Sequence, residues 1–139
     1  MNFYVLSRQS AKSESYRLTE PTLIISITDP ALELNSFADN KNIVGICRVQ
    51  FDDVTKENAR PSDVLMSPED AAKIKDYVIS YMDKVENVIV HCEGGISRSA
   101  GVMAAIQRYI TGDDSSILHS SRYLPNDHCY RLMLKAFGL

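Results

Sequence analysis

The chain has 139 residues, 45% of them hydrophobic and 24% charged, and its 15 Lys and Arg against 18 Asp and Glu give a formal net charge of −3. This length and composition predict one globular domain over residues 1–139, and they exclude collagen-like, low-complexity and intrinsically disordered chains. The slight acidic excess argues against nucleic acid or an anionic membrane as the main partner, because both require a clustered basic excess.

The cysteines and the N-terminal residues indicate the kind of protein and its compartment. The three cysteines, Cys47, Cys92 and Cys129, are odd in number and widely spaced, and the chain has only three histidines. We therefore expect neither a disulfide framework nor a metal site, and no cofactor. Residues 1–7 lack the basic and apolar regions of a leader, and no apolar run approaches the ~20 residues of a membrane span. These features predict a monomer in the reducing cytoplasm, where a free thiol keeps its reactivity.

The first elements expected along the chain are strands. Short β-branched apolar runs predict strands at 3–6, 23–27 and 43–51, and the polar stretches 10–17 and 56–63 are expected to be mobile connecting loops. A fourth run at 88–90 is apolar at every position. That pattern is typical of a central strand covered by helices on both faces.

Three helices are expected in the second half of the chain. At 67–70 a serine cap, a proline and a carboxylate open the first helix, whose apolar spacing continues to Val85. The second spans 98–110, before Gly112, and the third follows a turn and cap at 125–126. Strands and helices together predict an α/β fold, with a central, mostly parallel sheet of about four to five strands flanked by helices on both faces.

The stretch 88–101 indicates a phosphate site, because a buried strand leads there through a glycine-containing turn into a helix. Successive backbone N–H groups of the turn can surround one tetrahedral oxyanion, since Gly94 and Gly95 allow backbone angles that other residues resist. Arg98 adds a planar fork that fits two phosphate oxygens. The predicted substrate-binding residues are Glu93, Gly94, Gly95, Ile96, Ser97 and Arg98.

Cys92 stands at the start of the same turn. The helix dipole, the ring of amides and the charge of Arg98 all favour an anionic thiolate there, placed for in-line attack on phosphorus. Cys47 and Cys129 have no such neighbours in the sequence and are expected to be inert core residues.

The register of the turn resembles the signature of a known family. His91, Cys92, Arg98 and Ser99 form a His-Cys-x5-Arg-Ser motif, which is similar to that of the cysteine-dependent protein tyrosine and dual-specificity phosphatases. The resemblance implies that superfamily's fold and a metal-free phosphomonoester hydrolase that acts through a cysteinyl-phosphate intermediate. It also implies that His91 orients the cysteine loop and that Ser99 donates a hydrogen bond to the thiolate. The chain contains no tryptophan, and so lacks the Trp-Pro-Asp loop of the large tyrosine phosphatases, which favours the small, dual-specificity-like branch.

The resemblance further implies a general acid on a loop that closes over the pocket. Residues 48–53 resemble the dual-specificity pattern in which alternating apolar positions precede the acid, and that register selects Asp53. Asp52 and Asp63 are alternatives. The Pro-Asn pair at 125–126 resembles a segment of the same branch in which the asparagine braces the loop.

The substrate is less narrowly defined. The loop residues 93–97 carry no lysine, which disfavours a multiply phosphorylated lipid headgroup. We expect a shallow pocket for phosphotyrosine, with phosphoserine or phosphothreonine as further protein substrates, or for a small phosphomonoester. Two other classes stay open: a phosphate-binding pseudophosphatase, and a thiol enzyme similar to rhodaneses or arsenate reductases.

Overall fold

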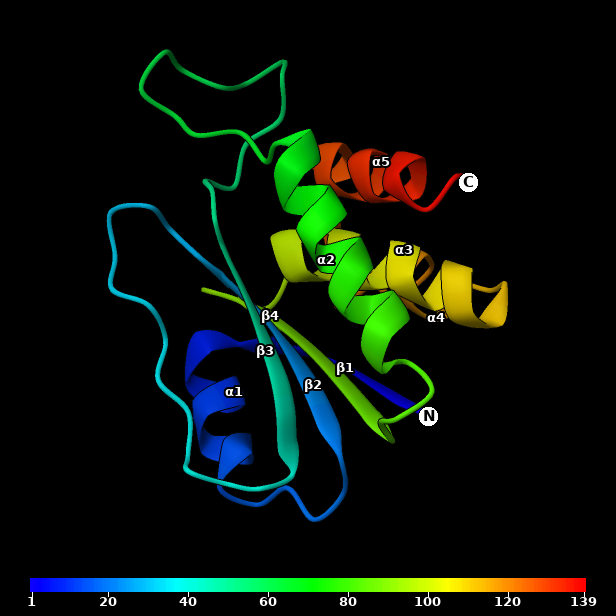
Figure 1. The fold of residues 1–139 in the computed structure, drawn as a ribbon. Coiled ribbons are helices and arrows are strands. Elements are labelled where there is room, and N and C mark those ends of the chain that lie inside the picture. The colour runs from blue at the N-terminus through cyan, green and yellow to red at the C-terminus, as the bar shows by residue number, and fades with distance from the viewer.

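Four parallel strands form one sheet in the computed structural model, which describes all of residues 1–139 (Figure 1). The strand order is β1-β4-β2-β3, with all neighbouring pairs parallel. The strands are β1 (Asn2–Ser7), β2 (Thr22–Thr28), β3 (Ile43–Gln50) and β4 (Asn87–Cys92). Because the strands are parallel, their carboxyl ends meet at one edge of the sheet, where open α/β sheets bind ligands.

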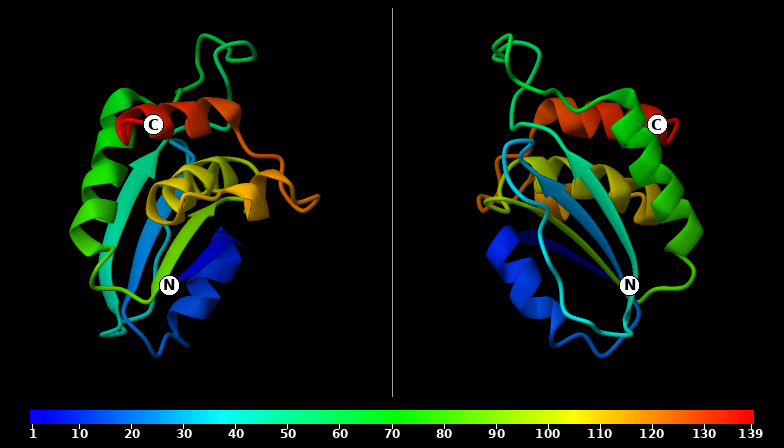
Figure 2. Two further views of the ribbon diagram at one scale, coloured as in Figure 1. Left: turned by 90° about the vertical axis from the view of Figure 1, so that its right-hand side faces the viewer. Right: turned by 60° about the vertical axis from the view of Figure 1, so that its left-hand side comes forward.

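Helices cover both faces of this sheet. Figure 2 shows α1 (Arg8–Ser15) on one face, opposite the larger helices. The other face carries α2 (Pro68–Tyr81), α3 (Arg98–Thr111), α4 (Ser115–Leu118) and α5 (Asp127–Ala136). The two inner strands, β2 and β4, are buried at every position, which explains why their sequences are apolar without alternation. The predicted fold class is therefore confirmed.

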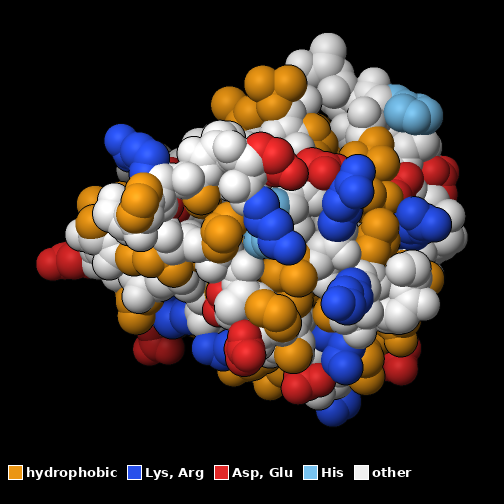
Figure 3. Space-filling view, turned by 90° about the horizontal axis from the view of Figure 1, so that it is seen from above, with side chains coloured by type: hydrophobic (Ala, Val, Ile, Leu, Met, Phe, Trp, Pro, Cys, Tyr) orange, Lys and Arg blue, Asp and Glu red, His pale blue; other side chains and the backbone are white.

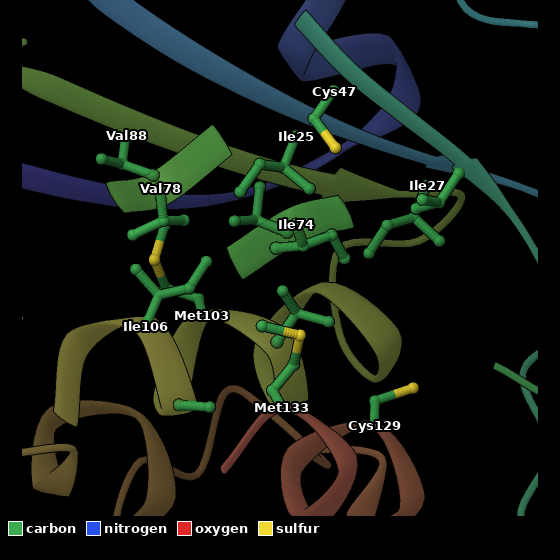
Figure 4. Packing of buried hydrophobic residues seen from close by; sticks show 14 of the residues in the cluster. Ile25, Ile27, Cys47, Ile74, Val78, Val88, Met103, Ile106, Cys129 and Met133 are labelled. Atoms are coloured by element: carbon green, nitrogen blue, oxygen red, sulfur yellow. The ribbon is translucent and has the colours of Figure 1, made fainter. Parts of the chain in front are cut away.

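The main core lies between the sheet and the larger helices. Figure 4 shows side chains of β2, such as Ile25, facing Ile74 of α2 and Met103 of α3, with Met133 of α5 behind them. These four side chains are fully buried. Burying one such side chain contributes about 1.5–3 kcal/mol to folding, so this layer holds α3 firmly against the sheet.

The predicted start of α2 is confirmed in detail. The Ser67 hydroxyl accepts from the Asp70 N–H at 3.1 Å, and the Asp70 carboxylate accepts from the Ser67 N–H at 3.0 Å, with Pro68 in the first turn. The helix ends at Tyr81, four residues before Val85. Val85 is buried from the turn that leads back into β4, so its apolar side chain belongs to the core without being helical.

The expectation of a mobile loop at 10–17 is wrong, because most of this stretch belongs to helix α1. Its polar sequence concealed the helix, which is capped by the Ser7 hydroxyl accepting from the Ser10 N–H at 3.1 Å. From α1, Ala11 packs in the small core on this face, against Ile24 and Ile89 of the sheet. The stretch 56–63, in contrast, contains neither helix nor strand. The short helix α4 was not expected either.

None of the helices combines the length and apolar character that crossing a membrane requires.

Candidate active site

The loop between β4 and α3 has a shape that only glycine allows at its centre. Gly95 has a φ of 70°, and a Cβ atom there would lie 2.6 Å from backbone atoms of Leu6 and Ser7. The loop therefore packs directly on the end of β1. Gly101, in the first turn of α3, approaches the backbone of Asn126 so closely that a Cβ would lie 2.5 Å from its carbonyl oxygen. The loop is therefore held at its centre by β1, and the start of the helix that follows it is held by the segment at Asn126.

Cys92 ends β4 with its side chain turned toward this loop. It is buried, and its Sγ lies 3.1 Å from Ser99 Oγ and 3.3 Å from the Gly95 nitrogen, which donates to it. Two polar hydrogens can thus point at the sulfur, an arrangement that suits a sulfur that carries or develops negative charge. The structure brings together Cys92, Ser99 and the loop as the sequence motif predicted.

The other two cysteines are in different surroundings. Burial raises the pKa of the Cys47 thiol to about 11, and burial together with the negative charge of Asp53 raises the pKa of Cys129 further. Both are fully buried core residues that stay protonated at neutral pH. They form no disulfide, and neither belongs to a cluster of His, Cys, Asp or Glu that could hold a metal ion.

Arg98 reaches back from the first turn of α3 to the ends of two strands. Its Nη1 donates to the Phe51 carbonyl at 2.7 Å and to Asp29 Oδ1 at 2.5 Å. The side chain is almost fully buried, and its Nε has no hydrogen-bond partner. An unpaired buried donor costs about 1–3 kcal/mol, so this nitrogen marks a place where a bound acceptor would be favourable.

Of the three candidate acids, Asp53 is the one that contacts the loop. Its Oδ1 accepts from Ser97 Oγ at 2.7 Å and from Asn126 Nδ2 at 2.9 Å, while the residue as a whole is exposed. Asp52 instead accepts from the Val64 N–H at 2.8 Å. Asp63 also stays within its own loop, where it accepts from the Arg60 N–H at 2.8 Å and lies 3.6 Å from the Arg60 guanidinium.

Asn126 joins the loop, the acid segment and α5. Its Nδ2 donates to Asp53 and to the Val54 carbonyl, and its Oδ1 accepts from the Cys129 N–H at 3.0 Å as the cap of α5. Its own backbone N–H donates to the Ser97 carbonyl at 3.0 Å. One buried amide thus ties three segments that are distant in the sequence.

His91, at the end of β4, is fully buried. Its Nδ1 lies 3.1 Å from the Cys92 carbonyl, which can only accept, so Nδ1 carries the proton. Its Nε2 then accepts from Ser26 Oγ at 2.6 Å, with Asn35 Nδ2 at 3.4 Å. Burial lowers the pKa of His91, which keeps the ring neutral at pH 7.

Glu93, the first loop residue after the cysteine, is held from β1 and α1. Its carboxylate pairs with the Arg8 guanidinium at 3.2 Å, and its carbonyl accepts from the Arg8 N–H at 3.2 Å. Gly94, Ile96 and Ser97 complete the loop, and Ile96 is half-exposed at its mouth. The predicted loop residues therefore lie with Asp53 at the carboxyl edge of the sheet, whereas Asp63 contacts only its own loop.

Sequence reasoning missed Asp29, Ser26 and Asn35. A usable signal existed for Asp29, because it directly follows a strand that reads as buried, and parallel strands end at the edge where Cys92 lies. Asn35 gave no such signal, because it lies in an irregular segment that folds back over the sheet.

Comparison with solved structures identifies the fold. The human tyrosine phosphatase-like serine/threonine/tyrosine-interacting protein matches with a TM-score of 0.68 and 17% identity, over 96% of this chain and 89% of that one. Human DUSP28 matches with a TM-score of 0.65 and 17% identity, over 98% and 91% of the two chains. PTPMT1 in complex with PI(5)P matches with a TM-score of 0.61 and 13% identity, over 99% and 90%.

The chain has the protein tyrosine phosphatase fold. No protein-family model matches it, and no curated protein is detectably similar in sequence, so the likeness lies in the structure. The predicted fold is confirmed.

Proposed function

We propose that the chain is a phosphomonoester hydrolase that acts through a cysteinyl-phosphate intermediate. The proposal rests on two features of one loop. The Cys92 sulfur accepts a hydrogen bond from the Gly95 N–H, and the buried Nε of Arg98 has no partner. A phosphoryl group bound between them would supply the missing acceptor. Nearly all catalysis of phosphoryl transfer comes from such positioning and charge stabilisation.

In the first step, the Cys92 sulfur attacks phosphorus and the bond to the ester oxygen breaks. Asp53 gives its proton to the departing oxygen, which leaves as an alcohol or phenol. Arg98 and the loop amides hold the equatorial oxygens, whose negative charge spreads in the transition state.

In the second step, water attacks the phosphorus of the cysteinyl phosphate and the P–S bond breaks. Asp53, now a carboxylate, takes a proton from the water, and inorganic phosphate leaves. The Ser99 hydroxyl, 3.1 Å from the sulfur, donates to the thiolate that departs in this step. The reaction needs a reduced thiol, so we place the protein in a reducing compartment such as the cytoplasm.

For the substrate we propose phosphotyrosine, with phosphoserine or phosphothreonine, on a protein. The loop offers no lysine for further phosphates. Two residues with exposed apolar side chains, Ile96 and Leu124, are joined through their backbones, where the Leu124 N–H donates to the Ile96 carbonyl. Figure 3 shows Lys and Arg intermingled with Asp and Glu on the face seen from above, which is the pattern of an ordinary surface rather than of a continuous basic patch.

A second candidate function is phosphate-dependent binding without turnover. It is favoured by the name of one structural neighbour, which is described as phosphatase-like and as an interacting protein. This chain keeps a cysteine and a well-placed aspartate, so the hydrolase stands first.

Hydrolysis of p-nitrophenyl phosphate by the wild type and by Cys92→Ser tests the proposal. We expect turnover by the wild type in the presence of a chelator, none by Cys92→Ser, and binding of inorganic phosphate by both. Binding without turnover in the wild type would establish the second candidate. Activity in a parallel thiosulfate–cyanide assay would instead indicate a sulfurtransferase.

A further inference from the structure

Asp29 is a second carboxylate at the candidate site, and the reaction proposed above does not use it. It follows β2 directly, at the edge where β4 delivers Cys92. Its Oδ1 lies 2.5 Å from Arg98 Nη1, and about one-third of its side chain is exposed. An anionic side chain beside a phosphate site opposes anion binding, so its presence calls for a compensating role.

The contacts of Arg98 suggest that role. Nη1 has two acceptors that come from neighbouring strand ends, Asp29 after β2 and the Phe51 carbonyl after β3. These strand ends are themselves joined, because the Phe51 N–H donates to the Thr28 carbonyl at 3.2 Å. Two acceptors on one terminal nitrogen fix the rotation of a guanidinium plane that its long, flexible stem would leave free.

We infer that Asp29 is a positioning residue, which holds the Arg98 guanidinium by Nη1 so that Nε is presented to the phosphoryl group. This inference rests on the proposed function. Asp29 acts only through the arginine and does not touch the substrate. Its benefit appears in the transition state, where a misplaced fork loses its fit to the equatorial oxygens.

The test compares Asp29→Asn with Asp29→Ala. Both variants remove the same charge, but only the asparagine keeps an oxygen that can accept from Nη1. We expect Asp29→Ala to lose roughly 10- to 100-fold in kcat toward p-nitrophenyl phosphate, the effect of a small misplacement. Asp29→Asn should keep most of kcat and bind inorganic phosphate at least as tightly as the wild type. Asp39→Ala is the matched control, because this aspartate is exposed and lies in the same irregular segment between β2 and β3.

A double-mutant cycle separates positioning from simple support of the fold. With Arg98→Lys there is no fork to orient, so the difference between Asp29→Asn and Asp29→Ala should vanish. A loss that is equally large in the Arg98→Lys background, or unchanged kcat in Asp29→Ala, would overturn the inference. A loss confined to substrates with poor leaving groups would overturn it too, since that is the behaviour of a proton donor.

Failure of the proposed function gives a different pattern. A wild type that binds phosphate without turnover overturns the proposal of a hydrolase. The same double-mutant cycle is then carried out on the affinity for inorganic phosphate, measured by calorimetric titration. Asp29→Ala should bind that ion more weakly than Asp29→Asn when Arg98 is present, and equally when lysine replaces it. Equal affinities with Arg98 present would refute the positioning role.

Discussion

The loop from Cys92 to Arg98 and the segment from Asp52 to Met66 both contribute to the candidate site, but they are held in different ways. The first is short, joins two buried elements and packs on β1 through Gly95. The second extends away from the sheet between β3 and α2 (Figure 1) and closes at its base, where Asp52 and Val64 exchange two hydrogen bonds.

The acid segment depends on distant partners. Asp53 is held by Ser97 and Asn126, which are 44 and 73 positions away in the sequence. The nucleophile is thus fixed by its own neighbours and the core, whereas the position of the acid depends on a few side-chain contacts at an exposed surface. Damage to the first region should therefore abolish chemistry, and damage to the second should weaken it selectively.

The largest effect expected, short of removing Cys92, is that of Arg98→Lys. The substitution keeps the charge but loses the planar fork, so we expect kcat to fall by roughly 10³- to 10⁵-fold, the range over which a phosphate-binding arginine acts. Turnover of p-nitrophenyl phosphate measures the loss, and urea unfolding shows whether the fold is intact. A near-normal kcat would mean that the arginine only supports the fold.

Asp53→Asn should have the next largest effect, and one that depends on the leaving group. An alkyl phosphate needs a proton on its departing oxygen, so its hydrolysis should slow by roughly 10²- to 10⁴-fold. A substrate that releases a stable anion should be far less affected. The basic limb of the pH profile should also disappear, since it reports loss of the acid's proton.

Matched variants of the neighbouring acids provide the control. Asp52→Asn and Asp63→Asn should leave the leaving-group dependence unchanged, because these carboxylates contact Val64 and Arg60 within their own loop. If either of them shows the selective loss instead, the assignment of Asp53 is wrong.

Asn126 offers a smaller test of how the acid is held. Asn126→Ala removes both the cap of α5 and the contacts to Asp53 and Val54, so it should cost about 1 kcal/mol in unfolding free energy as well as activity. Asn126→Ser keeps a capping oxygen but is too short to donate to Asp53. It should restore stability without restoring the rate for poor leaving groups. Recovery of both together would show that Asn126 acts through the helix alone.

The same contrast explains what could be predicted from the sequence. The loop after β4 could be predicted from the sequence because its strand, glycines, arginine and hydroxyl are contiguous. All the residues that form this part of the site therefore lie in one short stretch. Asp53 was selected only through its resemblance to the dual-specificity pattern, although β3 ends at Gln50 and the aspartate lies beyond it. Asp29 and α1 were missed because they depend on tertiary contacts. The partner of Asp29 is Arg98, 69 positions away, and α1 is held by its cap and by two buried residues, Ala11 and Ser15.

The smallest effect expected concerns the pH dependence of stability, through His91. Burial lowers the pKa of this histidine, whereas in the unfolded chain it should titrate near the usual ~6.5. Below that pH the unfolded state therefore binds a proton that the folded state excludes. The free energy of unfolding should fall as the pH drops below about 6.5, by at most about 1.4 kcal/mol per pH unit for one proton, and should be insensitive to this group above pH 7. Urea unfolding between pH 5.5 and 7.5 measures the slope.

In His91→Gln the slope should be lost, although overall stability is lower because Ser26 and the Cys92 carbonyl lose their partner. In His119→Gln, where the removed ring is exposed, the slope should persist. A slope that persists in His91→Gln would show that another group titrates, and that the buried ring behind the cysteine loop plays no part in acid sensitivity.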